Sequence, residues 1–225
     1  MLTTLGFLLA ATFLRLTLSV CRKICLLIIG PPFRGLRWLN VEDGYPGIVE
    51  IVELRKGGKP HPKLVYRYRT RAHYALQIHK SKTGWTANFV LTDLPTELEK
   101  SCESELFQYF VEEPLAFAAK VGDREVGWVE VALHSFKDRA RIWELLVLEE
   151  FQGKGIGTAL IQRAEDRARR KGLRSVVLET QSCNVKAIDF YMARGYTLVG
   201  FDEQAYSNED VEKGEIRLEF GKKLR

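Results

Sequence analysis

The strongest constraint on what this chain can fold into lies between Ile142 and Ala159. Residues 143–147 are apolar except for Glu144, which is typical of a largely buried strand. A glycine-rich segment follows at residues 152–158, and apolar residues then recur with a helical period. A strand, a glycine turn and a helix N-terminus in this order form an anion site, because the turn exposes backbone N–H groups and the helix dipole adds positive charge. We therefore expect a phosphate or pyrophosphate ligand here.

Two common phosphate-binding patterns do not fit this turn. Lys154 precedes the last glycines, which excludes a P-loop, and a dinucleotide fingerprint starting at Gly155 would need a glycine where Leu160 stands. The turn instead reads Gln152-Gly153-Lys154-Gly155-Ile156-Gly157 and matches Gln/Arg-x-x-Gly-x-Gly/Ala. It resembles the acetyl-CoA pyrophosphate loop of the GNAT N-acetyltransferases. The alternative is a tight turn that binds nothing.

A second motif follows the strand predicted at Ser175–Thr180 and reads Asn184-x-x-Ala-x-x-Phe-Tyr191-x-x-x-Gly195-Tyr. Asn184 fits a helix N-cap and Gly195 a helix stop. Asn184 and Tyr191 lie on one helix face roughly 10 Å apart, so a narrow ligand could lie along it. Core packing with a cap is the alternative. The motif is similar to the second GNAT motif, and residues 178–181 and 200–202 resemble the streptothricin acetyltransferases in particular.

The resemblance, which covers about residues 115–224, implies the GNAT fold. This is an α/β fold with a mixed, mostly antiparallel central sheet, helices on both faces and a V-shaped splay between the two parallel central strands. The strand patterns agree with it. Glu125–Leu133 and Ala140–Leu148 are joined by a short turn and should be antiparallel, whereas Ser175–Thr180 follows a helical crossover and should be parallel to its predecessor.

The resemblance also implies acetyl-CoA as the co-substrate and a set of residues around it. Tyr191 would protonate the leaving thiolate, and backbone N–H groups of Leu146 to Leu148 would stabilise the developing oxyanion. The predicted cofactor-binding residues are Leu146, Val147, Leu148, Gln152, Gly153, Lys154, Gly155, Gly157, Thr158, Asn184 and Tyr191.

A general base is needed as well, because a lysine-type amine has a pKa of about 10.4. Glu144, on the cofactor strand, is the first candidate for the catalytic base, with Glu130 and Glu179 in reserve. Pairing of any of these carboxylates with an arginine is the alternative.

The predicted function is transfer of the acetyl group of acetyl-CoA to a primary amine, expected to be a small cationic, streptothricin-like molecule. The chain after Phe201 carries the acids Asp202, Glu203, Glu209, Asp210 and Glu212, which could attract a cation or form a solvated turn. Acetylation of protein N-termini or lysines is the second hypothesis. A non-catalytic module that binds acyl-CoA is the third.

Residues 41–93 carry strand patterns where many family members have two helices. Leu64–Arg71 alternates, with Leu64, Tyr66 and Tyr68 on one face, which is typical of a half-buried edge hairpin. Thr96 and Glu99 have capping-box spacing and predict a helix. The buried stripe expected for that helix is Leu98, Cys102, Leu106, Tyr109 and Phe110.

Residues 1–40 differ in composition from the GNAT domain predicted at residues 41–225. The apolar run is interrupted by Arg15 and by Arg22-Lys23, so it fits neither a spanning helix nor a secretory signal well. Membrane contact through residues 1–29, with the domain facing the cytoplasm, and a misplaced start codon both stay open. Gly30-Pro31-Pro32 marks the boundary.

Charge and cysteine content exclude few functions. A net charge of +5 suits an anionic cofactor, a membrane surface or nucleic acid, but no RNA-binding motif is present and we expect no nucleic-acid partner. The four cysteines form no CxxC pair and no zinc-ligand spacing with histidine, so we predict no metal and a cytoplasmic protein with reduced thiols. A homodimer stays open.

Overall fold

The computed structural model describes residues 36–37, 49–58, 60–134 and 138–225. Almost all of residues 1–40 lie outside this set, so the predicted anchor and the domain boundary stay predictions. None of the helices in the described ranges is long and apolar enough to cross a membrane. The architecture below concerns the unit formed by residues 37–225.

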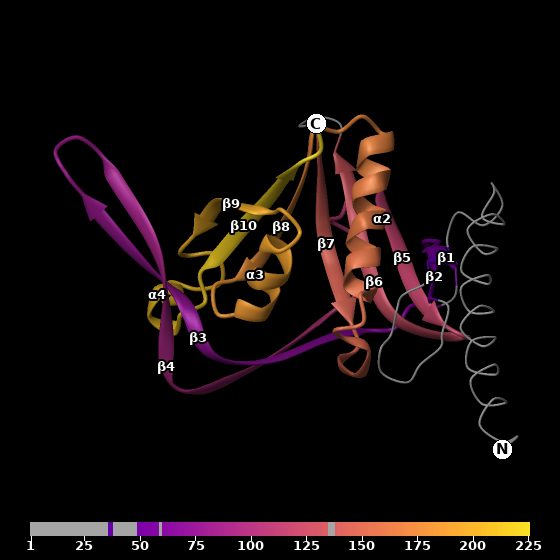
Figure 1. The fold of residues 1–225 in the computed structure, drawn as a ribbon, viewed down its shortest axis with the longest axis horizontal. Helices are drawn as coiled ribbons and strands as arrows, with labels where there is room; N and C mark the ends of the chain where they lie inside the picture. Colours follow the sequence, from indigo (N-terminus) through magenta and orange to yellow (C-terminus); the bar gives the residue numbers. More distant parts are fainter. Residues whose placement is uncertain (1–35, 38–48, 59, 135–137) are drawn as a thin grey trace, which may run out of the picture. The chain divides into compact units, whose positions relative to one another are not determined.

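One mixed sheet, in the order β1-β2-β5-β6-β7-β8-β10-β9, organises the described residues (Figure 1). From β2 to β9 the neighbouring strands are antiparallel, except that β7 and β8 are parallel. The predicted α/β fold with a mixed, mostly antiparallel sheet is thereby confirmed. The strands are β1 (Leu36–Arg37), β2 (Val49–Leu54), β5 (Pro114–Val121), β6 (Arg124–His134), β7 (Arg139–Val147), β8 (Ser175–Gln181), β9 (Thr197–Asp202) and β10 (Arg217–Lys223).

The parallel pair separates after three residues. Arg139–Arg141 of β7 pair with Ser175–Val177 of β8, and no pairing continues beyond them. Strand β7 nevertheless stays paired with β6 as far as Val147, opposite Gly127. The C-terminal half of β7 therefore has an open edge toward β8, which is the predicted V-shaped splay.

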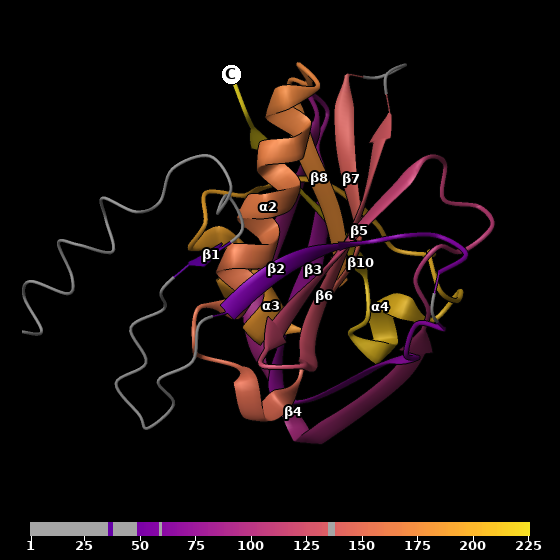
Figure 2. The same cartoon turned by 90° about the vertical axis from the view of Figure 1, so that its right-hand side faces the viewer.

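The two longer helices cover one face of the sheet. Helix α2 (Ile156–Arg170) follows β7, and α3 (Val185–Met192) follows β8; Figure 2 shows both on the same side of the strands. Their apolar residues join the sheet in what we call the helix-side cluster. It includes Phe117, Val129, Val131, Leu160, Ala164, Leu178, Ile188, Tyr196 and Phe220. Within the described residues, the short elements η2 (Glu149–Phe151) and α4 (Asp210–Lys213) are the other helical segments.

Extended chain, in place of the predicted helix, covers the opposite face. Strands β3 (Leu64–Lys80) and β4 (Trp85–Ser104) form a separate antiparallel hairpin that runs past α3 and α4 (Figure 1). Its base and the chain just after it close a second apolar cluster, the hairpin-side cluster. The buried members of that cluster are Leu64, Leu106, Ala116, Ala118 and Trp128.

The helix predicted to start at Thr96 is wrong, because β4 occupies residues 85–104. Glu99, which the sequence assigned to the capping box, instead forms an ion pair with Arg69 of β3 at 3.2 Å, and Glu97 pairs with Arg71 at 3.0 Å. Opposite charges across a strand pair favour this register, although each exposed pair contributes little free energy. Of the predicted stripe, Leu106 is buried, but the exposed fraction of Tyr109 is 95%.

A substitution at the base of the hairpin tests whether β3 belongs to the core. Leu64 is completely buried, so Leu64→Ala should lower the free energy of unfolding by about 2–5 kcal/mol. Leu91, on the partner strand, is 54% exposed, and Leu91→Ala should change it by no more than about 0.5 kcal/mol. Urea denaturation measures both variants. Equal, small losses would mean that β3 does not seal the hairpin-side cluster.

Candidate active site

The glycine turn between β7 and α2 has the backbone shape that an anion site needs. Gly153 and Gly155 adopt φ angles of +74° and +79°, a left-handed conformation that favours glycine. Gly155 is the N-cap of α2, and its carbonyl accepts the first intrahelical bond, from Ala159 N. The N–H groups of residues 156–158 therefore have no acceptor within the helix.

Close helix packing explains the third glycine of the turn. A Cβ atom on Gly157 would lie 3.1 Å from Cζ of Phe190, so the start of α2 approaches α3 closely. Thr158 has a structural role as well, because its Oγ1 accepts hydrogen bonds from the Arg194 guanidinium, including one of 3.0 Å from Nε. The same guanidinium stacks on the Phe190 ring, 3.5 Å from the ring centroid. The two helices are thus locked together beside the turn.

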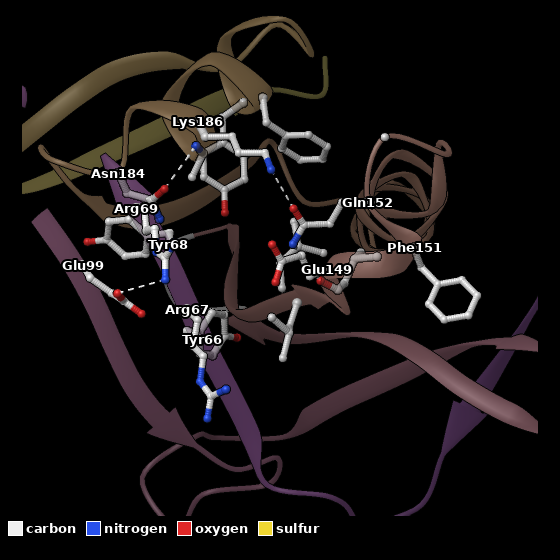
Figure 3. A pocket seen from close by; sticks show the side chains of 18 residues that line it. Tyr66, Arg67, Tyr68, Arg69, Glu99, Glu149, Phe151, Gln152, Asn184 and Lys186 are labelled. Atoms are coloured by element: carbon white, nitrogen blue, oxygen red, sulfur yellow. Dashed lines mark hydrogen bonds and ion pairs between the residues drawn. The ribbon is translucent and has the colours of Figure 1, made fainter. Parts of the chain in front are cut away.

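A cavity of about 650 Å³ connects this turn with the splayed strands and with β3 (Figure 3). Four segments line it: the turn, the end of β7, one face of α3, and β3 with its partner strand. Of the predicted cofactor-binding residues, it is lined by Leu146, Val147, Gln152, Gly153, Gly157, Asn184 and Tyr191. The predicted residues Leu148, Lys154, Gly155 and Thr158 do not line it.

Only one of the three predicted oxyanion donors points toward the open edge of β7. The Leu148 N–H donates to Val126 O at 2.9 Å and is therefore already paired with β6. The prediction of Leu148 as an oxyanion donor is wrong. N–H directions alternate along a strand, which places the Leu146 N–H in the same ladder and turns the Val147 N–H toward the splay. The Val147 carbonyl faces the same way and accepts a 3.0 Å hydrogen bond from Gln152 Nε2.

Gln152 and Asn184 hold the two walls of the cavity in place. Gln152 Oε1 accepts a 2.8 Å hydrogen bond from Lys186 Nζ, so this side chain joins β7 to α3, as Figure 3 shows. Asn184 caps α3 as predicted, its Oδ1 accepting from Ala187 N at 3.3 Å. Both side chains also line the cavity, which agrees with a double role in structure and binding.

Tyr191 lines the cavity from α3. The ring is buried in the helix-side cluster, and burial, followed by the charge of Glu144, raises the pKa of this phenol to about 12. No side chain or backbone group in the described part of the chain forms a hydrogen bond with the hydroxyl. A protonated, unpaired phenol inside a cavity is suited to donate a proton to a ligand.

Three side chains, those of Tyr66, Ser104 and Gln108, form hydrogen bonds with Glu144 of β7. Its Oε2 accepts a 2.6 Å hydrogen bond from Tyr66 Oη, and its Oε1 accepts one of 2.6 Å from Ser104 Oγ. Gln108 Nε2 donates to Ser104 Oγ at 2.8 Å and reaches Glu144 Oε1 at 3.5 Å. Burial raises the pKa of the Glu144 carboxyl, although the hydrogen bonds from Ser104 and Tyr66 oppose that rise. A carboxylate with a raised pKa is a stronger base.

The two reserve carboxylates have structural partners. Glu179 forms ion pairs with Arg141 and, at 4.0 Å, with Arg217, as the alternative in the sequence prediction allowed. Glu130 is completely buried directly opposite Glu144 in the β6–β7 ladder, and it accepts a hydrogen bond from the Phe107 backbone N–H. Burial raises the pKa of the Glu130 carboxyl as well. Glu144 is thus the one of the three carboxylates that contacts a side chain of the cavity wall.

Sequence reasoning missed the residues that β3 contributes to the site. Tyr66 reaches Glu144 on β7, and Tyr68 Oη donates to Gln181 Oε1 at the end of β8, so one strand bridges both arms of the splay. The backbone follows the same course, since Tyr74 N donates to Ser182 O at 3.0 Å. The shared face of Tyr66 and Tyr68 was visible in the sequence, but nothing in it identified the partner strands.

The acidic segment after Phe201 is largely paired within the fold. Asp202 accepts from Arg217 at 3.1 Å, and Glu209 pairs with Lys213 at 3.0 Å. Asp210 is buried and accepts hydrogen bonds from Tyr206 N and Ser207 Oγ, so it shapes the start of α4. None of the five acids lines the cavity, which disfavours the hypothesis that this segment recruits the acceptor.

Comparison with known proteins gives consistent matches. The Acetyltransferase (GNAT) family is matched over residues 85–196. A streptothricin acetyltransferase from Escherichia coli is 33% identical over 107 residues, which cover 48% of this chain and 61% of that protein. N-alpha-acetyltransferase 30 from Schizosaccharomyces pombe is 30% identical over 105 residues, covering 44% and 70%.

A solved structure shows the same fold over most of the chain. It is a Bacillus anthracis str. Ames protein assigned as a streptothricin acetyltransferase, in complex with acetyl coenzyme A. The TM-score is 0.62 at 21% identity, and the match covers 78% of this chain and 97% of that one. The chain spans about half the length of most curated relatives that it matches, such as 43% and 48% for the first two.

The glycine turn provides a test of acetyl-CoA binding. A Glu at position 153 would place a negative charge in the cavity wall, where no atom lies within 4 Å of the new Cβ. Because like charges brought together cost several kcal/mol, Gly153→Glu should weaken acetyl-CoA binding by at least about 10-fold in calorimetry. Gly172→Glu is the matched control, since Gly172 has φ +75° and equal free space beyond the other end of α2. Equal affinity of the two variants would exclude this turn as the pyrophosphate site.

Proposed function

The chain belongs to the GNAT acetyltransferase family, and on this premise we propose that it transfers the acetyl group of acetyl-CoA to a primary amine. The observation that carries the proposal is the single cavity that joins the glycine turn, the open edge of β7 and the Tyr191 hydroxyl. An anion site, an oxyanion donor and a proton donor thereby belong to one cavity, as the pyrophosphate, the thioester carbonyl and the sulfur of acetyl-CoA require.

The residues of the turn fit the pyrophosphate of acetyl-CoA. The unpaired N–H groups at the start of α2 supply donors, and the left-handed glycines leave no side chain in front of them. Lys186 adds a positive charge at the rim of the same cavity. The pantetheine arm would then lie along the open edge of β7, where a backbone N–H and C=O face the splay.

The reacting groups lie on the two sides of that edge. The Val147 N–H is directed to stabilise the oxygen of the thioester carbonyl as it gains charge. Tyr191 would donate a proton to the departing CoA sulfur, and Glu144 would receive the proton that the acceptor amine must lose. Tyr191 would thus give a proton and Glu144 would receive one. Burial keeps the Tyr191 phenol protonated and makes the Glu144 carboxylate more basic.

A small cationic amine of the streptothricin type is the acceptor class that we favour. The buried Glu144 carboxylate provides the charge that would attract an ammonium group, and three curated relatives are streptothricin acetyltransferases. Strand β3 bridges the arms of the splay beside Glu144 and so narrows the space in which an acceptor can lie. Similarity to an N-alpha-acetyltransferase makes protein N-termini the second candidate class.

Release of CoA thiol from acetyl-CoA tests the proposal directly. The panel contains polyamines, streptothricin-like and aminoglycoside-like amines, and N-terminal peptides, and whole-protein mass spectrometry detects acetylated protein acceptors. We expect turnover with the small cationic amines. Tight acetyl-CoA binding without turnover of any amine would instead indicate a binding module.

The hydroxyl of Tyr191 separates catalysis from packing. Tyr191→Phe keeps the ring in the helix-side cluster and should leave the KM for acetyl-CoA nearly unchanged. If the phenol protonates the thiolate, kcat should fall by about 10- to 1000-fold. The loss should shrink as the pH rises, because protonation matters less once the thiolate is stable in solution. A kcat equal to that of the wild type from pH 6 to 9, with chemistry rate-limiting, would show that Tyr191 only packs.

A further inference from the structure

The carboxylate proposed as the base does not itself line the cavity. Both of its oxygens accept hydrogen bonds from within the protein, Oε2 from Tyr66 and Oε1 from Ser104 and Gln108. Neither Ser104 nor Gln108 lines the cavity, whereas Tyr66 does. Tyr66 therefore stands between Glu144 and any amine that enters the cavity.

We propose that Tyr66 is a catalytic residue that passes the proton of the acceptor amine to Glu144. The inference rests on the proposed acetyltransferase function and adds a residue to it. The Tyr66–Glu144 hydrogen bond of 2.6 Å has the short length of a charge-assisted O–H···O⁻ bond, along which a proton can move. The Leu145 backbone N–H also acts on the phenol oxygen, which keeps its other lone pair for a hydrogen bond from the amine.

The transfer balances without any further reactant. The N–H⁺ of the acceptor gives its proton to Tyr66 Oη while the phenolic proton passes to Glu144 Oε2. The products are a neutral amine, an intact Tyr66 hydroxyl and a protonated Glu144. The amine nitrogen then attacks the thioester carbon and becomes positively charged. The C–S bond breaks, the CoA sulfur leaves with a proton supplied by Tyr191, and the second proton lost by the new amide nitrogen restores the Tyr191 hydroxyl. Tyr66 is never a free tyrosinate, which agrees with the rise that burial causes in the pKa of this phenol.

The groups around Glu144 leave this route and no shorter one. Across the ladder lies Glu130, which cannot accept the proton from the cavity because it is completely buried. From α3 comes Tyr191, which has the opposite task at the sulfur. Cys102 of β4 and Glu179 of β8 also influence this cluster electrostatically, but neither lines the cavity.

Two variants that each remove one hydroxyl from Glu144 make a matched pair. Tyr66→Phe and Ser104→Ala both delete a 2.6 Å hydrogen bond, and both should raise the apparent pKa of the ascending limb in the pH profile of kcat/KM. Only Tyr66→Phe removes the relay. The plateau value of kcat/KM should fall by about 100-fold or more in Tyr66→Phe, which is the usual scale of acid–base catalysis. In Ser104→Ala it should fall only a few-fold.

Glu144→Gln and the double variant Tyr66→Phe/Glu144→Gln test whether the two residues act together. If the two residues act as one unit, Glu144→Gln should lose as much activity as Tyr66→Phe, and the double variant should lose little more. The wild type should also show a solvent isotope effect on kcat/KM with a curved proton inventory, because two protons move together. In Tyr66→Phe this curvature should disappear. Acetyl-CoA affinity, unchanged in all variants, verifies that each is folded.

Equal plateau values for Tyr66→Phe and Ser104→Ala would overturn the relay and leave Tyr66 as a group that only adjusts the pKa of Glu144. Additive losses in the double variant would overturn it as well. These outcomes differ from failure of the proposed function, in which the wild type itself releases no CoA with any amine in the panel.

Discussion

Strands β7 and β8 share a ladder of only three residue pairs, and the site depends on their separation beyond it. Buried backbone groups must find hydrogen-bond partners, so a strand that loses its neighbour has to be satisfied in another way. Gln152 supplies part of the answer by donating to the Val147 carbonyl. The Val147 N–H, on the same edge, stays available to a ligand. The opening in the sheet thus creates both the space for a ligand and a polar group that can recognise it.

The hairpin β3–β4 stabilises the two arms of this opening. Tyr66 reaches β7 and Tyr68 reaches β8, while the hairpin base is anchored by Leu64 in the hairpin-side cluster. A two-stranded hairpin is only marginally stable alone, so these contacts with the main sheet are what hold it. Because side chains alternate along a strand, both tyrosines lie on the same face of β3, and the ion pairs between β3 and β4 favour the register of the hairpin. The chemistry near Glu144 therefore depends on a segment far from the glycine turn in the sequence.

Local patterns predicted the glycine turn, the helix cap and the direction of β8, but failed on the hairpin that lines the other side of the cavity. The turn at residues 152–158, the Asn184 cap and the direction of β8 follow from glycines, caps and connection lengths, which act over a few residues. The helix expected at Thr96 was wrong because Glu99 fits both a capping box and an ion pair with Arg69, and only the tertiary pairing decides between them. The hydrogen-bond partner of Tyr66, Glu144, lies 78 residues away along the chain, and no local signal encodes such a distance.

Burial has opposite consequences for the two groups that we propose as base and acid. It raises the pKa of the Glu144 carboxyl, which strengthens the base, and it raises the pKa of Tyr191 to about 12, which weakens the acid. A weak acid is sufficient because a thiolate with a pKa of about 8.5 is a tolerable leaving group. A strong base is needed because an ammonium with a pKa of about 10.4, roughly three units above neutral pH, holds its proton firmly. The environment therefore favours the harder of the two proton transfers. An ammonium entering the cavity would also lower the electrostatic cost of the buried carboxylate, which is a physical reason for a cationic acceptor.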